Sequence, residues 1–206
     1  MSGLFITFEG VEGCGKSTQV ARLREQLTSR GLRVVLTREP GGTAIAEAIR
    51  SIVLDPRNTA ITPVTELLLY AAARAQHVDE LIRPELDAGA IVISDRFADS
   101  TTAYQGAGRN LDRALIKRMH ETATRGTWPD ITFLLDLPAE LGLERARSTG
   151  AFDRIEGEPL QFHQAVREEF LRIAEKDSAR IHVIDARQSA DIVADEVWRA
   201  VEANLK

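Results

Sequence analysis

The sequence predicts an α/β fold in which a five-stranded parallel sheet is flanked by helices. Five short apolar runs rich in β-branched residues alternate with longer stretches whose apolar residues recur near a helical period. The short runs are almost continuously apolar, as strands buried on both faces should be. A chain of 206 residues with 44% hydrophobic content, divided by no repeat or low-complexity tract, fits a single domain over residues 1–206.

Each element can be placed along the chain. The expected strands are residues 4–8, 33–37, 90–94, 131–137 and 180–184. In the first expected helix, Val20, Leu23 and Leu27 form the apolar face. Joins such as "EPGG" and "TWPD" contain glycine or proline and mark loops. The expected helices are residues 16–29, 43–53, 65–88, 112–125, 139–148, 160–176 and 189–205.

Charge and composition exclude several classes of partner. Lys plus Arg total 26 against 31 for Asp plus Glu, and the net charge of −5 predicts no attraction to nucleic acid or anionic lipid. No leader-like segment and no apolar run of membrane-spanning length occurs, so we expect no membrane insertion and a cytoplasmic location. The single cysteine, Cys14, leaves no internal disulfide framework. The histidines at positions 77, 120, 163 and 182 lack metal-site spacing and are expected to be surface or packing residues.

A glycine-rich stretch, "FEGVEGCGKSTQ", lies at the first strand-to-helix junction. Gly10, Gly15, Lys16 and Ser17 match the phosphate-binding pattern G-x-x-x-x-G-K-[ST]. The backbone amides of such a loop surround nucleotide phosphates, the lysine reaches the β- and γ-phosphates, and the hydroxyl binds Mg²⁺. The expected nucleotide-binding loop consists of Gly10, Val11, Glu12, Gly13, Cys14, Gly15, Lys16, Ser17 and Thr18.

Two further strand ends carry an arginine beside a carboxylate. "AIVISDRF" ends in Asp95 and Arg96, and "TREPGGT" places Arg38 and Glu39 at the same edge of the sheet, where ligands bind in open parallel sheets. Arginine suits recognition of a second phosphate. The Asn-Lys-x-Asp element of GTPases is absent, and the third strand lacks the terminal Asp-Glu pair typical of hydrolytic motors. The pattern therefore favours a kinase with two phosphate sites.

The motifs "EGVEGCGKST", "TREPGGT", "YAAARAQH", "DRFADSTTAYQGAGR" and "DRIE" resemble, in order and spacing, those of the thymidylate kinase family. The resemblance covers essentially the whole chain. It implies the P-loop NTPase fold of nucleoside monophosphate kinases, ATP as phosphoryl donor with Mg²⁺, dTMP as acceptor in dTTP biosynthesis, and a homodimer. Three alternatives stay open: a kinase for another nucleoside monophosphate, a P-loop ATPase or switch, and a non-catalytic nucleotide-binding module.

The resemblance also implies roles for the residues at the strand ends. Arg38 and Arg96 would hold the dTMP phosphate, and Arg96 would act in catalysis together with Lys16 of the P-loop. Asp95 and Glu39 would order Mg²⁺ and its water ligands, with Asp95 counted among the catalytic residues. Glutamate at position 12 would accept the 3′-hydroxyl of the sugar.

Further along the chain, the resemblance implies a pocket for the base. Tyr70 and Arg74 are four positions apart on one helix and therefore share a face. Tyr70 would stack on thymine, and Arg74 would donate to an exocyclic oxygen. Thr101 and Gln105 would make polar contacts to the base. Tyr104 would lie under C2′ and exclude a ribose hydroxyl.

A positive charge on the transferring phosphoryl group is expected from a mobile lid. Some thymidylate kinases carry an arginine in the P-loop, but this chain has Gly13 at that position. The expected lid is the stretch around residues 144–157, whose small residues and arginines suit a flap over ATP. Arg147 is the expected catalytic arginine and Arg154 is the alternative, whereas Arg145 is expected to lie against the adenine ring.

Overall fold

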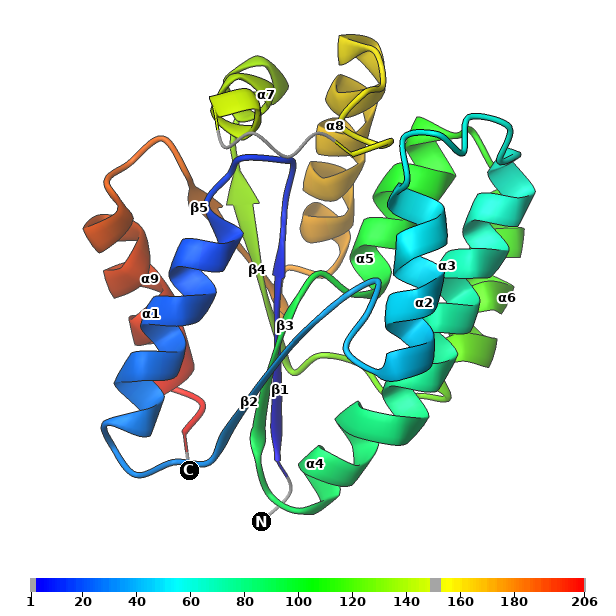
Figure 1. The fold of residues 1–206 in the computed structure, drawn as a ribbon. Helices are drawn as coiled ribbons and strands as arrows, with labels where there is room; N and C mark the ends of the chain where they lie inside the picture. Colours follow the sequence, from blue (N-terminus) through cyan, green and yellow to red (C-terminus); the bar gives the residue numbers. More distant parts are fainter. Residues whose placement is uncertain (1–2, 149–152, 206) are drawn as a thin grey trace.

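The computed structural model describes residues 3–148 and 153–205. Its centre is a five-stranded sheet with the order β2-β3-β1-β4-β5, in which every pairing is parallel. The five expected strands are confirmed, with each end within one residue of the expected position. Their carboxyl ends meet at one edge of the sheet, at the top of Figure 1. The strands are β1 (Leu4–Glu9), β2 (Val34–Arg38), β3 (Ile91–Asp95), β4 (Ile131–Asp136) and β5 (Ile181–Asp185).

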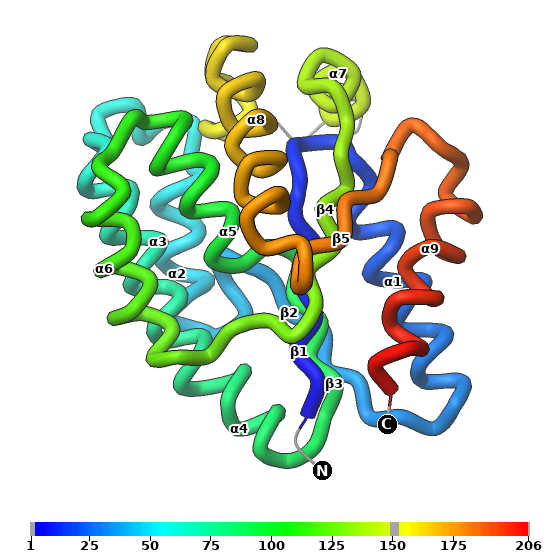
Figure 2. Tube along the Cα trace, turned by 180° about the vertical axis from the view of Figure 1, so that it is seen from behind, coloured from blue at the N-terminus to red at the C-terminus, as the bar shows by residue number. Residues whose placement is uncertain are grey.

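Helices cover both faces of this sheet. Figure 1 shows α1 and α9 side by side on one face, with α2, α3 and α6 on the other. Figure 2, seen from behind, shows α5 between α6 and α8. None of the helices in the described part of the chain is long and apolar enough to cross a membrane. The helices are α1 (Lys16–Thr28), α2 (Ala44–Leu54), α3 (Pro63–His77), α4 (Arg83–Asp87), α5 (Ala98–Thr101), α6 (Arg113–Thr124), α7 (Ala139–Ser148), α8 (Leu160–Lys176) and α9 (Ala190–Glu202), with π-helical turns η1 (Val78–Ile82) and η2 (Thr102–Gly108).

Several expected helix starts are N-cap residues. The side chains of Thr43, Asp112 and Ser189 accept a hydrogen bond from the backbone amide three residues later, and α2, α6 and α9 begin at the next residue. Such a bond satisfies one of the amides that have no partner within the helix. The apolar period and the cap therefore agree on where these helices begin.

The long helix expected over residues 65–88 is interrupted in the structure. It divides into α3, η1 and α4, and the amide of Arg83 bonds to the carbonyl of Val78, five residues earlier. The cause is Pro84, which lacks an amide proton and whose ring clashes with the carbonyl four residues before it. The sequence analysis also missed α5 and η2, because the segment that forms them is rich in Ser, Thr and Gly and has low helix propensity.

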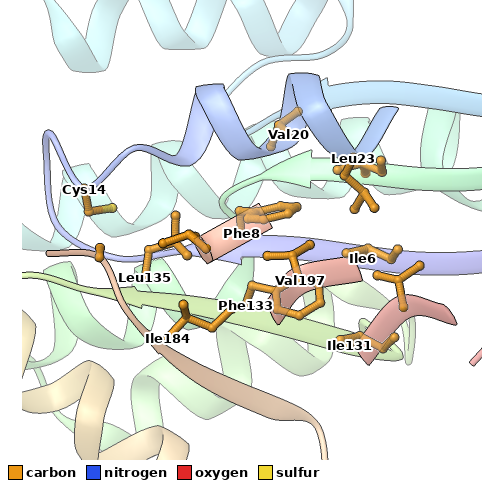
Figure 3. Close-up of a cluster of buried hydrophobic side chains, with 14 of the residues drawn as sticks. Ile6, Phe8, Cys14, Val20, Leu23, Ile131, Phe133, Leu135, Ile184 and Val197 are labelled. Carbon is orange, nitrogen blue, oxygen red and sulfur yellow. The ribbon is translucent and has the colours of Figure 1, made fainter. Parts of the chain in front are cut away.

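The largest core cluster fills the space between the sheet and helices α1 and α9. Figure 3 shows Phe8 and Phe133 from adjacent strands facing Leu23 and Val197 from the two helices. The two phenyl rings are 5.2 Å apart between centroids. The thiol of Cys14 closes this cluster at the P-loop end. Packing on this face therefore fixes where β1 ends and where the P-loop begins.

Candidate active site

The loop between β1 and α1 has the backbone geometry of a phosphate-binding loop. Gly13 and Gly15 have φ angles of 65° and 94°, in the left-handed region that favours glycine. A Cβ atom at Gly13 would lie 2.2 Å from the carbonyl oxygen of Gly142 in α7, so an arginine does not fit there. A Cβ atom at Gly15 would meet nothing within 4 Å, so the loop is open at the N-terminus of α1. The missing P-loop arginine thus has a steric cause.

Lys16 begins α1 and keeps its ammonium group within the loop. Its Nζ donates to the carbonyl oxygen of Val11 at 2.9 Å and lies 3.5 Å from the sulfur of Cys14. The side chains of Val11 and Cys14 belong to the core cluster, so only their backbone can face a nucleotide. Thr18 is exposed at the start of the helix. The loop therefore offers one cation and a row of amides to a phosphate chain.

An oxygen pair beside the P-loop fits a magnesium ion. The Ser17 hydroxyl donates to Oδ2 of Asp95 over 3.2 Å and joins α1 to the end of β3. Mg²⁺ is usually held by one or two protein oxygens together with phosphates and water, and this hydroxyl and carboxylate are ligands of that kind. Within the described residues there is no group of three or more His, Cys, Asp or Glu arranged to hold a metal ion on its own.

A pocket of about 240 Å³ opens next to the P-loop at the carboxyl edge of the sheet. Its walls come from the ends of β2 and β3, from α2, α3 and η2, and from the segment that precedes α8. The structure therefore collects side chains from distant parts of the chain in one crevice. Every residue predicted to bind the acceptor lines this pocket: Glu12, Arg38, Tyr70, Arg74, Arg96, Thr101, Tyr104 and Gln105.

Glu12 is the centre of a hydrogen-bond network in the pocket. Its Oε1 accepts from the Tyr104 hydroxyl at 2.6 Å and from Nη2 of Arg96 at 3.2 Å. Its Oε2 lies 3.2 Å from Nδ1 of His163. Burial alone would raise the pKa of Glu12, but the hydrogen bond from His163 and the charges of Arg96 and Lys16 outweigh it and lower the pKa to about 2. Glu12 is therefore an ionised acceptor at neutral pH.

Arg74 lies at the floor of the pocket with only 2% of its side chain exposed. Its Nε donates to Oε2 of Glu39 at 2.7 Å, and its Nη1 donates to the Thr101 hydroxyl at 2.9 Å. The other oxygen of Glu39 lies 3.0 Å from Nδ1 of His77. Both oxygens of Glu39, which the sequence predicts to order Mg²⁺, are thus engaged by other side chains. Among the expected metal ligands, the side chains of Ser17 and Asp95 hydrogen-bond only to each other within the described part of the chain, so their oxygens are better placed for a metal ion than those of Glu39.

Three guanidinium groups line the side of the pocket near the sheet edge. Arg96 has a φ of 72° and turns its side chain back toward Glu12. Arg38 is 55% exposed and pairs with Glu47 at 3.1 Å. Arg50 from α2 is the third, and the sequence analysis did not single it out. Burial lowers the pKa of Arg50, and the neighbouring charge of Arg38 acts in the same direction. Three guanidinium groups on one side of the pocket suit an anionic phosphate.

The three arginines considered for the lid have different surroundings. Nη1 of Arg145 donates to a carbonyl after β5 at 3.3 Å. Arg147 lines a separate groove between α7 and the start of α8, outside the acceptor pocket. Arg154 is 9% exposed and its Nη2 donates to Oε2 of Glu66 at 2.6 Å. The middle of the expected lid, residues 149–152, lies outside the described part of the chain. Arg154 is therefore a partly buried ion-pair partner of Glu66, and Arg147 lies outside the acceptor pocket.

Sequence reasoning missed the contacts of three buried polar residues. His77 and His163 are fully buried, which agrees with the packing role that was one of the two expected, but their contacts with carboxylates of the site were not expected. Glu66 is 1% exposed and binds Gln105, Arg109 and Arg154, and it was not singled out. No spacing rule signals such contacts, because His163 and Glu12 are separated by 151 positions along the chain.

Fold and site together define a class of protein. A P-loop that adjoins an arginine-rich pocket with an aromatic side chain places the phosphates of a donor nucleotide next to an acceptor site, which is the arrangement of a P-loop nucleotide kinase. The family model for thymidylate kinase matches residues 8–197. The chain therefore belongs to the thymidylate kinase family.

Individual relatives are similar over nearly the whole chain. The thymidylate kinase of Geobacter sulfurreducens is 53% identical over 201 residues, covering 95% of this chain and 94% of the relative. The thymidylate kinase of Oleidesulfovibrio alaskensis is 51% identical and covers 96% and 97%. The crystal structure of thymidylate kinase from Ehrlichia chaffeensis superposes with a TM-score of 0.80 at 35% identity, covering 98% and 99%. The P-loop fold expected from the sequence is confirmed.

Proposed function

We propose that this chain transfers the γ-phosphoryl group of ATP to dTMP, giving dTDP and ADP for dTTP synthesis. Membership of the thymidylate kinase family supports the reaction. The observation that carries the proposal is that Tyr70 and Arg74 share one pocket with Gly13 and Lys16 of the P-loop. A nucleotide that stacks on Tyr70 would therefore direct its phosphate toward the P-loop.

Positioning and charge neutralisation supply the catalysis. A phosphate oxygen of dTMP attacks the γ-phosphorus of ATP, the bond to the β-γ bridging oxygen breaks, and ADP leaves. The dTMP phosphate is already ionised near neutral pH, so no protein base is required. Lys16 balances charge on the donor phosphates, and Arg96 together with Arg38 holds the acceptor phosphate in line. When bound through Ser17 and Asp95, Mg²⁺ supplies charge neutralisation to the donor phosphates.

The sugar and base of dTMP are assigned to the inner part of the pocket. Glu12 would accept the 3′-hydroxyl, since its carboxylate is ionised and faces the pocket. Tyr70 would stack on the base, and Arg74 would donate a remaining N–H to an exocyclic oxygen. Tyr104 would close the space under C2′, because its ring is packed against Phe162 at a centroid distance of 6.1 Å.

A single domain with a lid around residues 144–157 completes the proposal. The steric exclusion of a side chain at Gly13 supports a lid arginine as the source of charge on the transferring phosphoryl group. Arg147 is assigned this role, because Arg154 is engaged by Glu66 and by the carbonyl oxygen of Val53 at 2.8 Å. Arg145 lies three positions after Gly142, the residue of α7 that contacts Gly13 of the P-loop. It is assigned to a contact with the adenine ring of ATP.

The proposed assembly is a homodimer joined through α2 and α3. These adjacent helices expose Ile45, Ile52, Val64 and Leu68, each between 47% and 55% accessible. Exposed apolar side chains on two adjacent helices suit an interaction surface, and self-association would bury them on both copies at once. Sedimentation of Leu68→Asp should give a single-chain mass, whereas Ile192→Asp on α9 should leave the dimer intact.

One coupled assay of ADP release tests the proposed reaction. The acceptors are dTMP, dUMP, dCMP, AMP and GMP at equal concentrations, and dTMP should give the highest kcat/KM. A single methyl group separates dUMP from dTMP, so dUMP should be used roughly 10–200-fold less well. A purine monophosphate as the best acceptor would indicate another nucleoside monophosphate kinase. ADP release without any acceptor would indicate an ATPase, and no release with any acceptor would indicate a binding module.

A further inference from the structure

Glu66, on the first turn of α3, is the meeting point of four hydrogen bonds. Its Oε1 accepts from Nε2 of Gln105 at 2.8 Å and from Nε of Arg109 at 3.1 Å. Its Oε2 accepts from Nη2 of Arg109 at 3.0 Å and from Nη2 of Arg154 at 2.6 Å. The carboxylate is 1% exposed, and although burial alone would raise its pKa, the hydrogen bonds from Arg109 and Gln105 outweigh this and lower it. Glu66 is thus ionised and can only accept.

This carboxylate fixes which way round the amide of Gln105 lies. An ionised carboxylate has no proton to donate, so the amide nitrogen of Gln105, not its oxygen, must face Glu66. The amide oxygen then remains for the pocket, which Gln105 lines. Among the described residues no hydrogen bond to this oxygen is made, and it is not one of the buried polar atoms without a partner. The pocket therefore presents a carbonyl acceptor at this point.

The neighbouring arginine presents the opposite polarity. Three N–H groups of Arg74 are used by Glu39, Thr101 and the carbonyl oxygen of Phe97. A guanidinium has five N–H groups, so two remain for a ligand. An acceptor and a donor that line the same pocket match a ring that carries an N–H next to a carbonyl oxygen. They oppose a ring that carries an unprotonated nitrogen next to an amino group.

We infer that Glu66 is a positioning residue that sets base specificity, holding the Gln105 amide so that the pocket selects an imide base such as thymine or uracil and rejects cytosine. The inference rests on the proposed use of this pocket for dTMP. Rotation of the amide would bring its oxygen against the Glu66 carboxylate and its N–H₂ toward the N–H of the base, so both contacts would become repulsive. The carboxylate thereby makes the selection without touching the ligand.

The experiment compares kcat/KM for dTMP and dCMP. In Glu66→Gln the new side chain can donate as well as accept, so the Gln105 amide is free to rotate. The ratio of kcat/KM for dTMP to kcat/KM for dCMP should then fall about 10-fold or more, which is the effect of one hydrogen bond. Glu66→Asp keeps an acceptor-only carboxylate and should keep the preference for dTMP. Glu158→Gln is the matched control, because Glu158 pairs with Arg109 at 2.7 Å but has no contact with Gln105.

A second probe needs no variant. N3-methyl-dTMP lacks the N–H that the Gln105 oxygen would accept, so the wild-type protein should use it at least about 10-fold less well than dTMP. In Gln105→Leu this difference should disappear. Equal use of dTMP and N3-methyl-dTMP by the wild-type protein overturns the inference whether or not Glu66→Gln folds. An unchanged ratio of kcat/KM for dTMP and dCMP in a folded Glu66→Gln also overturns the inference, while the proposed function stands. A wild-type protein that is inactive with dTMP would instead overturn the proposed function.

Discussion

The hydroxyl of Tyr104 donates to the carboxylate of Glu12 over 2.6 Å, so one residue of η2 contacts the P-loop and also lines the acceptor pocket. Its ring, 6% exposed, packs edge-on against Phe162 and Phe170, both at 6.1 Å. The hydroxyl and the ring can therefore have separate functions. The hydroxyl orients a carboxylate, and the ring limits the space around the sugar.

Two substitutions at Tyr104 separate these functions. Tyr104→Ala removes the ring and should raise kcat/KM for the ribonucleotide of thymine, relative to dTMP, by about 10-fold. A change of this size is expected when a pocket gains room for one small substituent. Tyr104→Phe keeps the ring and should leave this ratio unchanged, while the KM for dTMP rises because Glu12 loses a donor. The measurement is kcat/KM for both acceptors. If both variants change the ratio equally, the hydroxyl and not the ring controls the sugar.

The arginines of the expected lid should differ in what their loss affects. Arg147→Ala should lower kcat at least about 100-fold with dTMP affinity nearly unchanged, the signature of a contact made mainly in the transition state. Arg154→Ala should instead lower the free energy of unfolding by about 1.5–3 kcal/mol, because it removes one charged partner of Glu66 and leaves the hydrogen bonds from Arg109 and Gln105. Steady-state kinetics and urea unfolding of both variants provide the measurement. A loss of kcat in Arg154→Ala without loss of stability would exchange the two assignments.

The P-loop and the strand ends could be predicted because their signals are local. Gly10, Gly15 and Lys16 stand in one short pattern, and Arg38 and Arg96 each follow an apolar run whose carboxyl end must lie at the ligand edge of a parallel sheet. The strand count and most helix starts follow from period and caps in the same way. Hydrophobic burial and capping act over a few residues, so sequence windows detect them.

Long-range contacts between polar side chains could not be predicted. Glu66 and Arg154 are 88 positions apart, and the pairing depends on how η2 and the segment before α8 approach α3. The π-helical turns were missed for a related reason. In η1 the turn follows from a single proline, but in η2 it forms around glycines that carry no helical period. The ion pair between Glu66 and Arg154 and the π-helical turn η2 both depend on tertiary packing, which no local sequence pattern can predict.

The thiol of Cys14 should be protected by the fold and not by nucleotide. It is 3% exposed and belongs to the core cluster behind the P-loop, where its sulfur lies 3.5 Å from Nζ of Lys16. Alkylation of the native protein should be at least about 10-fold slower than in denaturant, since reaction requires local opening. Saturating Mg²⁺–ATP should slow alkylation only by stabilising the folded protein. Once this stabilisation is taken into account, the alkylation rate should change by less than about 2-fold. Cys14→Ala is the unlabelled control, and complete protection by ATP alone would show that the thiol faces the nucleotide.

A buried carboxylate at the end of β1 should make stability depend on pH. Glu9 is 1% exposed and accepts from the amide of Phe97 at 2.8 Å and from the hydroxyl of Ser100 at 2.5 Å. Burial, reinforced by the charge of Asp99, raises the pKa of Glu9 from 4.5 to about 7. Between these two values the folded protein keeps a proton that the unfolded chain has lost. The contribution of Glu9 to stability is therefore complete below pH 4.5 and is lost as the pH rises through about 7.

Glu9→Gln should remove this dependence, because an amide can still accept from Phe97 and has no proton to lose in this range. The wild-type free energy of unfolding should fall between pH 5 and 7 more steeply than that of Glu9→Gln, by up to about 1.4 kcal/mol per pH unit. Urea unfolding at several pH values provides the measurement, with Glu25→Gln on the exposed face of α1 as the control that keeps the wild-type slope. Parallel pH profiles for the wild type and Glu9→Gln would show that Glu9 is ionised in the folded protein throughout this range.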